Sequence, residues 1–120
     1  MDRASPVLLF LSLSTTITAT ALSAVDFQKE IAPIFAEHCL ECHGPEKVKG
    51  GLNLTTRDGI LKELKSGNIA VTPGKPDMSV LIERLLTSDD DEIMPPRKKE
   101  RRPSTEEISR LKAWIAEGAP

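Results

Sequence analysis

Apolar side chains recur every three or four residues through most of the chain beyond residue 25, and polar side chains fill the positions between them. This spacing puts the apolar side chains on one face of a helix. The pattern predicts four helices, located before residue 43, after residue 56, after residue 76 and after residue 104. A strand is marked by sustained alternation of apolar and polar residues, and the chain shows only one weak candidate strand, at residues 69–72. We therefore predict an all-α domain.

The first and last predicted helices carry clear boundary signals. Ser104 and Glu107 have the spacing of a capping box, and Gly118 ends the last helix. Asp26 can cap the first helix. Pro33 either kinks that helix or lies in its first turn.

The two middle helices are bounded by Gly, Pro and Thr. Thr56 can cap the second helix and Gly67 closes it, while a Pro-Gly-Lys-Pro turn at residues 73–76 leads into the third. The apolar positions expected to face the core are Phe27, Ile31, Ile34 and Phe35 in the first helix, Ile60, Leu61 and Leu64 in the second, Met78, Leu81, Ile82, Leu85 and Leu86 in the third, and Ile108, Leu111 and Ile115 in the last, with Trp114 at the edge of its stripe.

The first 24 residues differ from the rest of the chain. Residues 4–24 carry no charge, with an apolar run at residues 7–13 followed by small residues, which is typical of a secretory signal peptide. We predict cleavage after Ala21 or Ala24 and export to the periplasm, leaving residues 25–120 as one domain. An uncleaved membrane anchor is the alternative, although the run is short for a span of ~20 residues.

Composition limits the core that this domain can build. Of the 120 residues, 39% are hydrophobic, with three Phe, one Trp and no Tyr, which suffices for a small core only. A bound apolar macrocycle could supply bulk that the side chains lack. The formal net charge is −2 and no basic face with interleaved aromatic residues is present, which argues against a nucleic-acid partner.

Cys39, Cys42 and His43 form the sequence Cys-x-x-Cys-His at the end of the first predicted helix, which is the signature of covalent haem attachment. Because residues three and four apart share a helix face, both thiols could add to the vinyl groups at one edge of a porphyrin. His43 could then bind the iron through a neutral imidazole nitrogen. We therefore predict one covalently bound haem c.

Three other interpretations of this motif stay open. A thioredoxin-like dithiol site normally lies where a strand leads into a helix, and no such pattern surrounds the cysteines. A zinc site needs four ligands, and the only nearby candidates are His38, Cys39, Cys42 and His43 in one short stretch. A disulfide, which two cysteines in an exported chain would ordinarily indicate, needs no adjacent histidine. The five-residue signature favours haem over all three.

The second axial position of a haem iron can be filled by methionine, histidine, water or substrate. We predict Met94, since the prolines at 95 and 96 stiffen its loop and a thioether ligand raises the reduction potential. Met78 shares the apolar stripe of its helix and is interpreted as core packing. His38 directly precedes Cys39 and is expected to point away from the haem into solvent.

Short motifs follow one another in a fixed order from residue 26 to residue 119. They are Asp26-Phe27, Ile31-Ala32-Pro33-Ile34, Cys39-x-x-Cys42-His43-Gly44, Gly50-Gly51-Leu52, Pro73-Gly74-Lys75-Pro76, Ile93-Met94-Pro95-Pro96, and Trp114-Ile115 through Gly118-Ala119. In this order they resemble the planctomycete-type cytochrome c domain. Phe35, Leu111 and Trp114 also resemble the contact between the first and last helices of class I cytochromes c. The resemblance implies a small helical domain wrapped around haem c, with Cys39, Cys42, His43 and Met94 at the matching positions.

This resemblance implies an electron carrier rather than an enzyme, with redox proteins as its partners. We expect a monomer, and the chain beyond the signal peptide gives no strong membrane signal. Two alternatives are a haem enzyme or sensor with an open sixth site, and a recognition or structural module that contains haem. Because the chain ends soon after Trp114-Ile115, where a further domain would follow, a free carrier and a remnant of a larger multidomain protein both stay open.

Further contacts to the haem are predicted from apolar residues near the motifs. The candidates for the pocket wall are Leu52, Leu54, Leu81, Leu85 and Trp114. Arg57 could neutralise a haem propionate, although a surface position is favoured. The basic run at residues 97–102 beside Met94 could dock an acidic redox partner, although a solvated loop is favoured.

Overall fold

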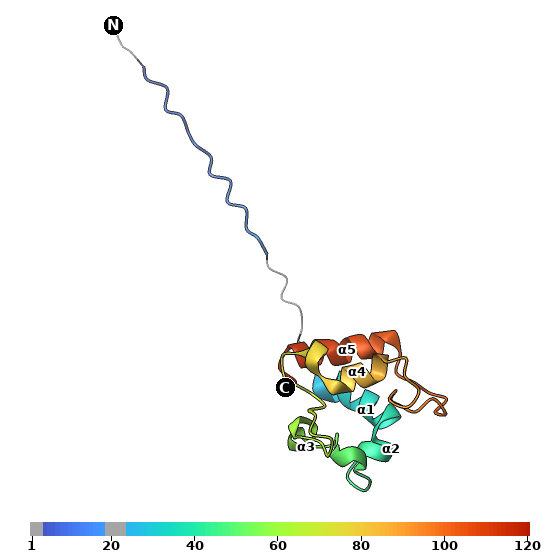
Figure 1. The fold of residues 1–120 in the computed structure, drawn as a ribbon. Helices are drawn as coiled ribbons and strands as arrows, with labels where there is room; N and C mark the ends of the chain where they lie inside the picture. The colour runs from blue at the N-terminus through green and yellow to red at the C-terminus, as the bar shows by residue number, and fades with distance from the viewer. Residues whose placement is uncertain (1–3, 19–23) are drawn as a thin grey trace.

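The computed structural model describes residues 4–18 and 24–120. In those two stretches the regular structure is helical, which confirms the predicted all-α class (Figure 1). The strand candidate at residues 69–72 is wrong, since only an isolated bridge pairs Ile69 with Glu63. The α-helices of these stretches are α1 (Ala32–His38), α2 (Leu40–His43), α3 (Arg57–Leu61), α4 (Val80–Leu86) and α5 (Thr105–Ala116), accompanied by the π-helical turn η1 (Phe27–Ile31) and the 3-10 turns η2 (Lys49–Gly51) and η3 (Pro76–Met78).

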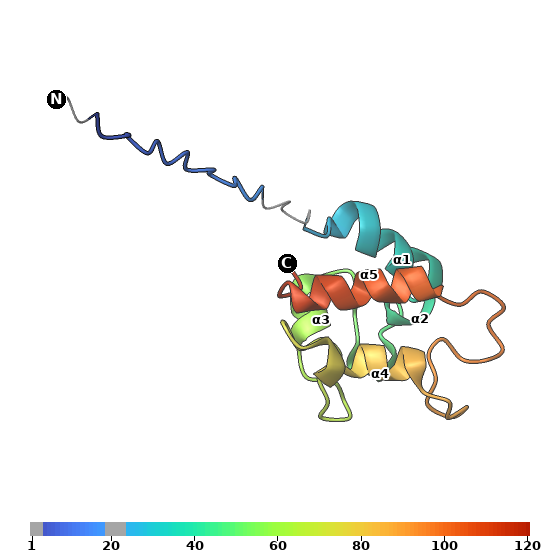
Figure 2. The ribbon, with the colours of Figure 1, turned by 90° about the horizontal axis from the view of Figure 1, so that it is seen from above.

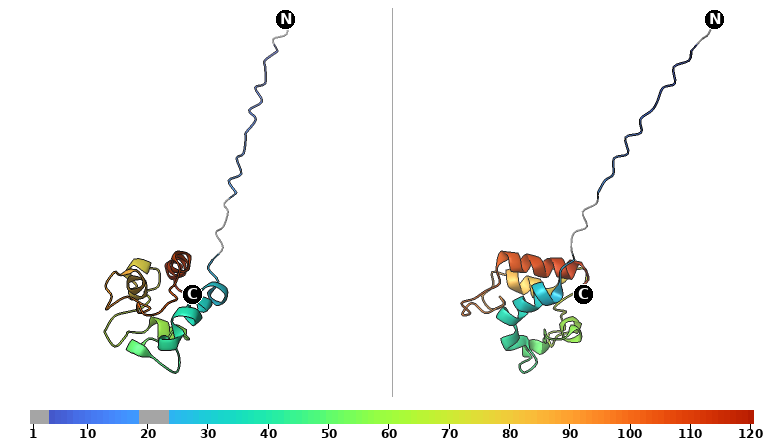
Figure 3. Two further views of the ribbon diagram at one scale, coloured as in Figure 1. Left: turned by 90° about the vertical axis from the view of Figure 1, so that its right-hand side faces the viewer. Right: turned by 180° about the vertical axis from the view of Figure 1, so that it is seen from behind.

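Helix α5 lies at the centre of this arrangement. It packs against η1 on one side and against α4 on the other. Figure 2 shows α5 running between α1 and α4, and the left view of Figure 3 looks almost along α5. Helix α3 lies beside the C-terminus, where the Arg57 guanidinium donates a hydrogen bond to the carbonyl of Ala119.

Residues 4–18 form no helix or strand, and their side chains are exposed (Figure 1). Of the two predicted cleavage positions, Ala24 is exposed and Ala21 lies outside the described residues. The signal peptide therefore stays a prediction. Within the described parts of the chain, no helix combines the length and the apolar character needed to cross a membrane.

The first helical segment has Pro33 in the first turn of α1, which is one of the two arrangements that the sequence allowed. The carboxylate of Asp26 caps the segment by accepting a hydrogen bond from the N–H of Lys29 at 3.0 Å. After the π-helical turn η1, α1 starts with Pro33 in its first turn. Pro33 therefore lies at the junction of the two turns and does not end the helix.

Helix α3 starts as predicted but ends early. The hydroxyl of Thr56 accepts a hydrogen bond from the N–H of Gly59 at 3.0 Å, which confirms the cap. The N–H of Leu64, predicted to be helical, instead donates to the carbonyl of Asn68 in a turn. Gly67, with φ at +83°, belongs to that turn and does not close the helix.

The predicted apolar face of the third helix is only partly correct. Met78 is 67% exposed and Leu86 is 55% exposed, so neither belongs to the core, while Ile82 is buried as predicted. Met78 lies in the separate turn η3, because α4 begins only at Val80. A side chain in η3 does not follow the helical direction of α4, which explains why the interpretation of Met78 as core packing was wrong.

Trp114 is the largest fully buried side chain of the domain and not an edge residue. Its ring lies 5.4 Å from that of Phe27 and 6.0 Å from that of Phe35, measured between centroids, and its indole N–H donates to the carbonyl of Pro120 at 3.0 Å. Aromatic contacts of this kind join α5 to η1 and α1. The other large side chains of this core include Ile31, Val71, Leu111 and Ile115.

Replacing Trp114 should destabilise the fold strongly, because it empties the centre of this aromatic cluster. We expect Trp114→Ala to lower the free energy of unfolding by about 3–5 kcal/mol. Denaturant titration followed by far-ultraviolet circular dichroism measures it. Arg110→Ala, on the exposed face of the same helix, is the control and should change stability by less than about 0.5 kcal/mol. Equal effects from the two variants would show that Trp114 does not hold the helices together.

Candidate functional site

A largely apolar cavity of about 500 Å³ lies between α1, α2, α4 and the loops that follow α2 and α4. This volume falls in the range of about 300–1,000 Å³ that is usual for ligand and cofactor sites. The cavity brings together Cys39, Cys42, His43, Leu52 and Met94, which the sequence places in three separate segments. Three more of the predicted wall residues also line it, namely Leu54, Leu81 and Leu85.

The two cysteines and the histidine reach this cavity because helical hydrogen bonds run through Cys39. The N–H of Cys39 donates to the carbonyl of Phe35, and the N–H of His43 donates to the carbonyl of Cys39, both at 2.9 Å. Gly44 then ends α2. A side-chain Cβ at Gly44 would lie 2.5 Å from the carbonyl oxygen of Leu40, so only glycine fits there without a shift of the backbone.

A hydrogen bond to the backbone of Lys49 holds His43 in one tautomer. Its Nδ1 lies 3.0 Å from the carbonyl oxygen of Lys49. Since a carbonyl can only accept, Nδ1 carries the proton, and Nε2 keeps a lone pair that can bind a metal ion. Burial lowers the pKa of His43, which keeps the ring neutral near pH 7.

The cysteine thiols are free in this structure, and the environment of Cys39 opposes thiolate chemistry. Burial, together with the negative charge of Glu107, raises the pKa of Cys39 to about 12. Zinc sites and dithiol redox sites use thiolates, which lower pKa values favour. In the described chain no strand leads into the cysteine helix, as thioredoxin-like sites require. The interpretations of the motif as zinc ligands or as a dithiol pair are therefore disfavoured.

Of the two methionines considered as ligands, Met94 lies at the cavity and Met78 does not. The side chain of Met94 is 38% exposed, and its N–H donates to the carbonyl of Arg84 in α4 at 2.8 Å. Pro95 and Pro96 line the cavity next to it, and the Met94–Pro95 peptide bond is cis. The structure thus places Met94 in the same cavity as His43.

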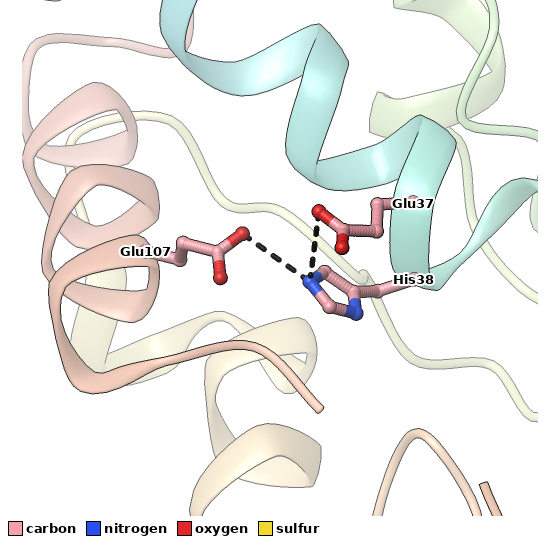
Figure 4. Close-up of side chains that lie close together, drawn as sticks. All are labelled: Glu37, His38 and Glu107. Atoms are coloured by element: carbon pink, nitrogen blue, oxygen red, sulfur yellow. Dashed lines mark hydrogen bonds and ion pairs between the residues drawn. The ribbon is translucent and has the colours of Figure 1, made fainter. Parts of the chain in front are cut away.

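His38 is buried, which corrects the expectation of a solvated side chain. Only 3% of its side chain is exposed, and it lines the cavity. Figure 4 shows its Nε2 facing two carboxylates, at 3.2 Å from Glu107 and 3.7 Å from Glu37. Its Nδ1 has no hydrogen-bond partner among the residues that the structure describes. The direction of its own helix could not reveal this, because α5 covers the histidine from 69 residues away along the chain.

Glu107 joins the cap of α5 to this histidine. The hydroxyl of Ser104 accepts from the N–H of Glu107, and the Glu107 carboxylate accepts from the N–H of Ser104, both at 3.1 Å, which confirms the predicted capping box. Burial alone would raise the pKa of Glu107, but the hydrogen bonds from Ser104 and the nearby His38 hold it below its usual value. One carboxylate therefore fixes both the start of α5 and the end of α1.

Two residues predicted near the haem are not among those that line the cavity. Trp114 is not among the residues that line the cavity, since it packs in the aromatic cluster behind it. Arg57 does not line the cavity either, because its guanidinium is bound to the carbonyl of Ala119 at the C-terminus. These positions place both residues in the packing around α3 and α5.

The basic run at residues 97–102 is largely engaged with the chain itself. Lys99 pairs with Glu41 at 2.6 Å, and that hydrogen bond lowers the pKa of Glu41. Arg97 and Arg101 pair with Asp90 and Glu37. Sequence reasoning missed these carboxylate partners because no local pattern indicates which distant acid will lie opposite each cation.

The chain matches the model of a known protein family. The family model of planctomycete cytochrome C matches residues 39–98, which is half of the chain and runs from the first cysteine past Met94. The searches of curated proteins and of solved structures gave no match. The matched segment contains both cysteines, His43, Leu52 and Met94, but not Trp114.

The hydrogen bond between His38 in α1 and Glu107 in α5 can be tested by substitution. Hydrogen bonds to charged groups contribute ~1.5–3 kcal/mol, so His38→Ala should lower the free energy of unfolding by about that amount. Guanidinium titration followed by far-ultraviolet circular dichroism measures it. A double-mutant cycle with Glu107→Ala separates the contribution of this hydrogen bond from that of the capping box. Additive effects of the two substitutions would show that His38 and Glu107 do not stabilise the fold through their mutual contact.

Proposed function

The chain belongs to the planctomycete cytochrome C family, and on that premise we propose that it binds one haem c covalently and transfers electrons. Membership of a cytochrome c family suggests haem binding and an electron-carrier role. The observation that carries the proposal is the meeting of Cys39, Cys42 and His43 in one apolar cavity, with the Nε2 of His43 free to bind a metal ion.

The residues at the cavity fit such a group. Two thiols that are not joined to each other line it, and a neutral imidazole lies beside them. The leucine side chains of the wall exclude water and match an apolar macrocycle. When bound, the haem iron supplies the redox chemistry by changing between its ferrous and ferric states.

Each residue then has a distinct role. Cys39 and Cys42 would hold the porphyrin through thioether bonds, and His43 would provide a nitrogen ligand to the iron. Met94 would provide a second ligand, a thioether sulfur that would raise the reduction potential. Leu52 belongs to the apolar wall, and the carbonyl of Lys49 keeps Nε2 of His43 unprotonated.

We also propose that the chain is exported and that its partners are redox proteins. The uncharged segment at residues 4–24, with its apolar run and small residues, supports export to the periplasm. Covalent haem attachment is compatible with that location. An electron carrier of this size exchanges electrons with other proteins through transient contacts, and we propose that it acts as a monomer.

Production in a host with haem-attachment machinery tests the covalent link. We expect a red protein that stains for haem on a denaturing gel, with an intact mass equal to one haem plus a chain that begins at residue 22 or residue 25. The double variant Cys39→Ser/Cys42→Ser should lose the stain, because no thioether can form. A colourless wild-type protein with both thiols free would refute haem attachment, and a mass that includes residues 1–24 would refute cleavage.

The second axial ligand is tested with a matched pair of methionine variants. Met94→Ala should abolish the methionine-to-iron charge-transfer band of the ferric protein and lower its reduction potential, because the sulfur that favours ferrous iron is lost. Met78→Ala makes the same change at an exposed site outside the cavity and should alter neither property. Visible spectra and a redox titration measure both. An unchanged spectrum and potential in Met94→Ala would instead favour an open sixth site.

A further inference from the structure

The loop that carries Met94 has few backbone hydrogen-bond donors next to that residue. Pro95 and Pro96 follow Met94 and have no N–H group. Pro95 is buried, and a buried carbonyl without a partner costs free energy. The carbonyl groups of Met94 and Pro95 therefore depend on side chains or water for their hydrogen bonds.

Arg102 supplies these donors. Its Nη2 donates to the carbonyl of Met94 at 3.2 Å, and its Nη1 donates to the carbonyl of Pro95. The neighbouring cations at residues 97, 99 and 101 bind carboxylates, whereas Arg102 has no carboxylate partner among the residues described in this structure. Because the guanidinium is a planar fork with several donors, it can hold two successive carbonyl groups at once.

Both peptide groups of Met94 are thereby fixed. On the N-terminal side, its N–H donates to the carbonyl of Arg84 at 2.8 Å, which attaches it to α4. On the C-terminal side, its carbonyl is held by Arg102, two residues before the Ser104 cap of α5. Met94 is therefore anchored to α4 and to the segment that leads into α5, two helices that pack against each other.

We infer that Arg102 is a positioning residue that holds Met94 in place as an iron ligand, an inference that rests on the proposed ligation by Met94. A methionine side chain is flexible, and its thioether is a weak ligand. Fixing the backbone in the bound geometry lowers the conformational entropy lost when the sulfur binds. Arg102 therefore helps Met94 to outcompete other ligands for the same position on the iron.

The test measures how readily imidazole displaces Met94 from the ferric iron of the holoprotein, followed by the visible spectrum. Because imidazole and Met94 compete for one position, a weaker Met94 bond appears as tighter imidazole binding. Arg102→Met should lower the dissociation constant of imidazole about tenfold, as expected for the loss of hydrogen bonds from a charged donor. Arg97→Met makes the same change in the same loop and should stay within about twofold of the wild type.

Met94→Ala separates failure of this inference from failure of the proposed ligation. If Met94→Ala binds imidazole no more tightly than the wild type, Met94 is not a ligand and the proposed ligation fails. If Met94→Ala binds more tightly but Arg102→Met matches Arg97→Met, the ligation stands and the role of Arg102 is wrong.

Arg102→Lys keeps the charge but loses the planar fork, and its dissociation constant should fall between those of the wild type and Arg102→Met. Arg102→Lys also tests the inference if Arg102→Met fails to incorporate haem. A value for Arg102→Lys equal to that of Arg97→Lys would then overturn the inference.

Discussion

The site depends on the helical hydrogen bonds that run through Cys39. The backbone of this residue departs from ideal helical values, with φ at −127° and ψ at −39°, yet its N–H and its carbonyl both keep helical partners at 2.9 Å. These bonds preserve the register across the bend, so that Cys39, Cys42 and His43 line one cavity. Phe35 accepts the first of these bonds and lies in the aromatic cluster, which ties the register of the motif to the core.

The core and the cavity share side chains, so filling the cavity should affect the stability of the fold. Phe35 and Leu111 are both fully buried and both line the cavity, while Trp114 lies behind them. With only 3% aromatic residues, the chain has few large side chains to fill this space itself. An apolar group in the cavity would extend the core, and any group that binds only the folded chain also stabilises it. The proposed haem would therefore be a structural element as well as a redox centre.

Local signals in the sequence were sufficient for the helix caps at Asp26, Thr56 and Ser104, for the all-α class and for the cysteine motif. These features depend on residues within one or two turns of each other. The positions of His38 and Trp114 were not predicted correctly, because each depends on which distant element packs against it, whereas Met78 was misplaced because η3 and α4 are separate elements. His38 is buried only because α5 crosses over it, and no periodicity within the first helix reports that crossing. The same reason explains why the carboxylate partners of His38 and of the basic run were missed.

The loop at residues 94–103 shows why a run of like charges need not be available to dock a partner, since most of its cations are paired within the chain. Its ion pairs are largely exposed, and exposed pairs contribute only ~0–1 kcal/mol each and weaken in salt. The hydrogen bond from Arg102 to the Pro95 carbonyl is partly buried, and a hydrogen bond from a charged donor is worth more than an exposed ion pair. The loop should therefore keep its place beside the cavity when salt screens the ion pairs. The cations at 97, 99 and 101 can then change partners without moving Met94.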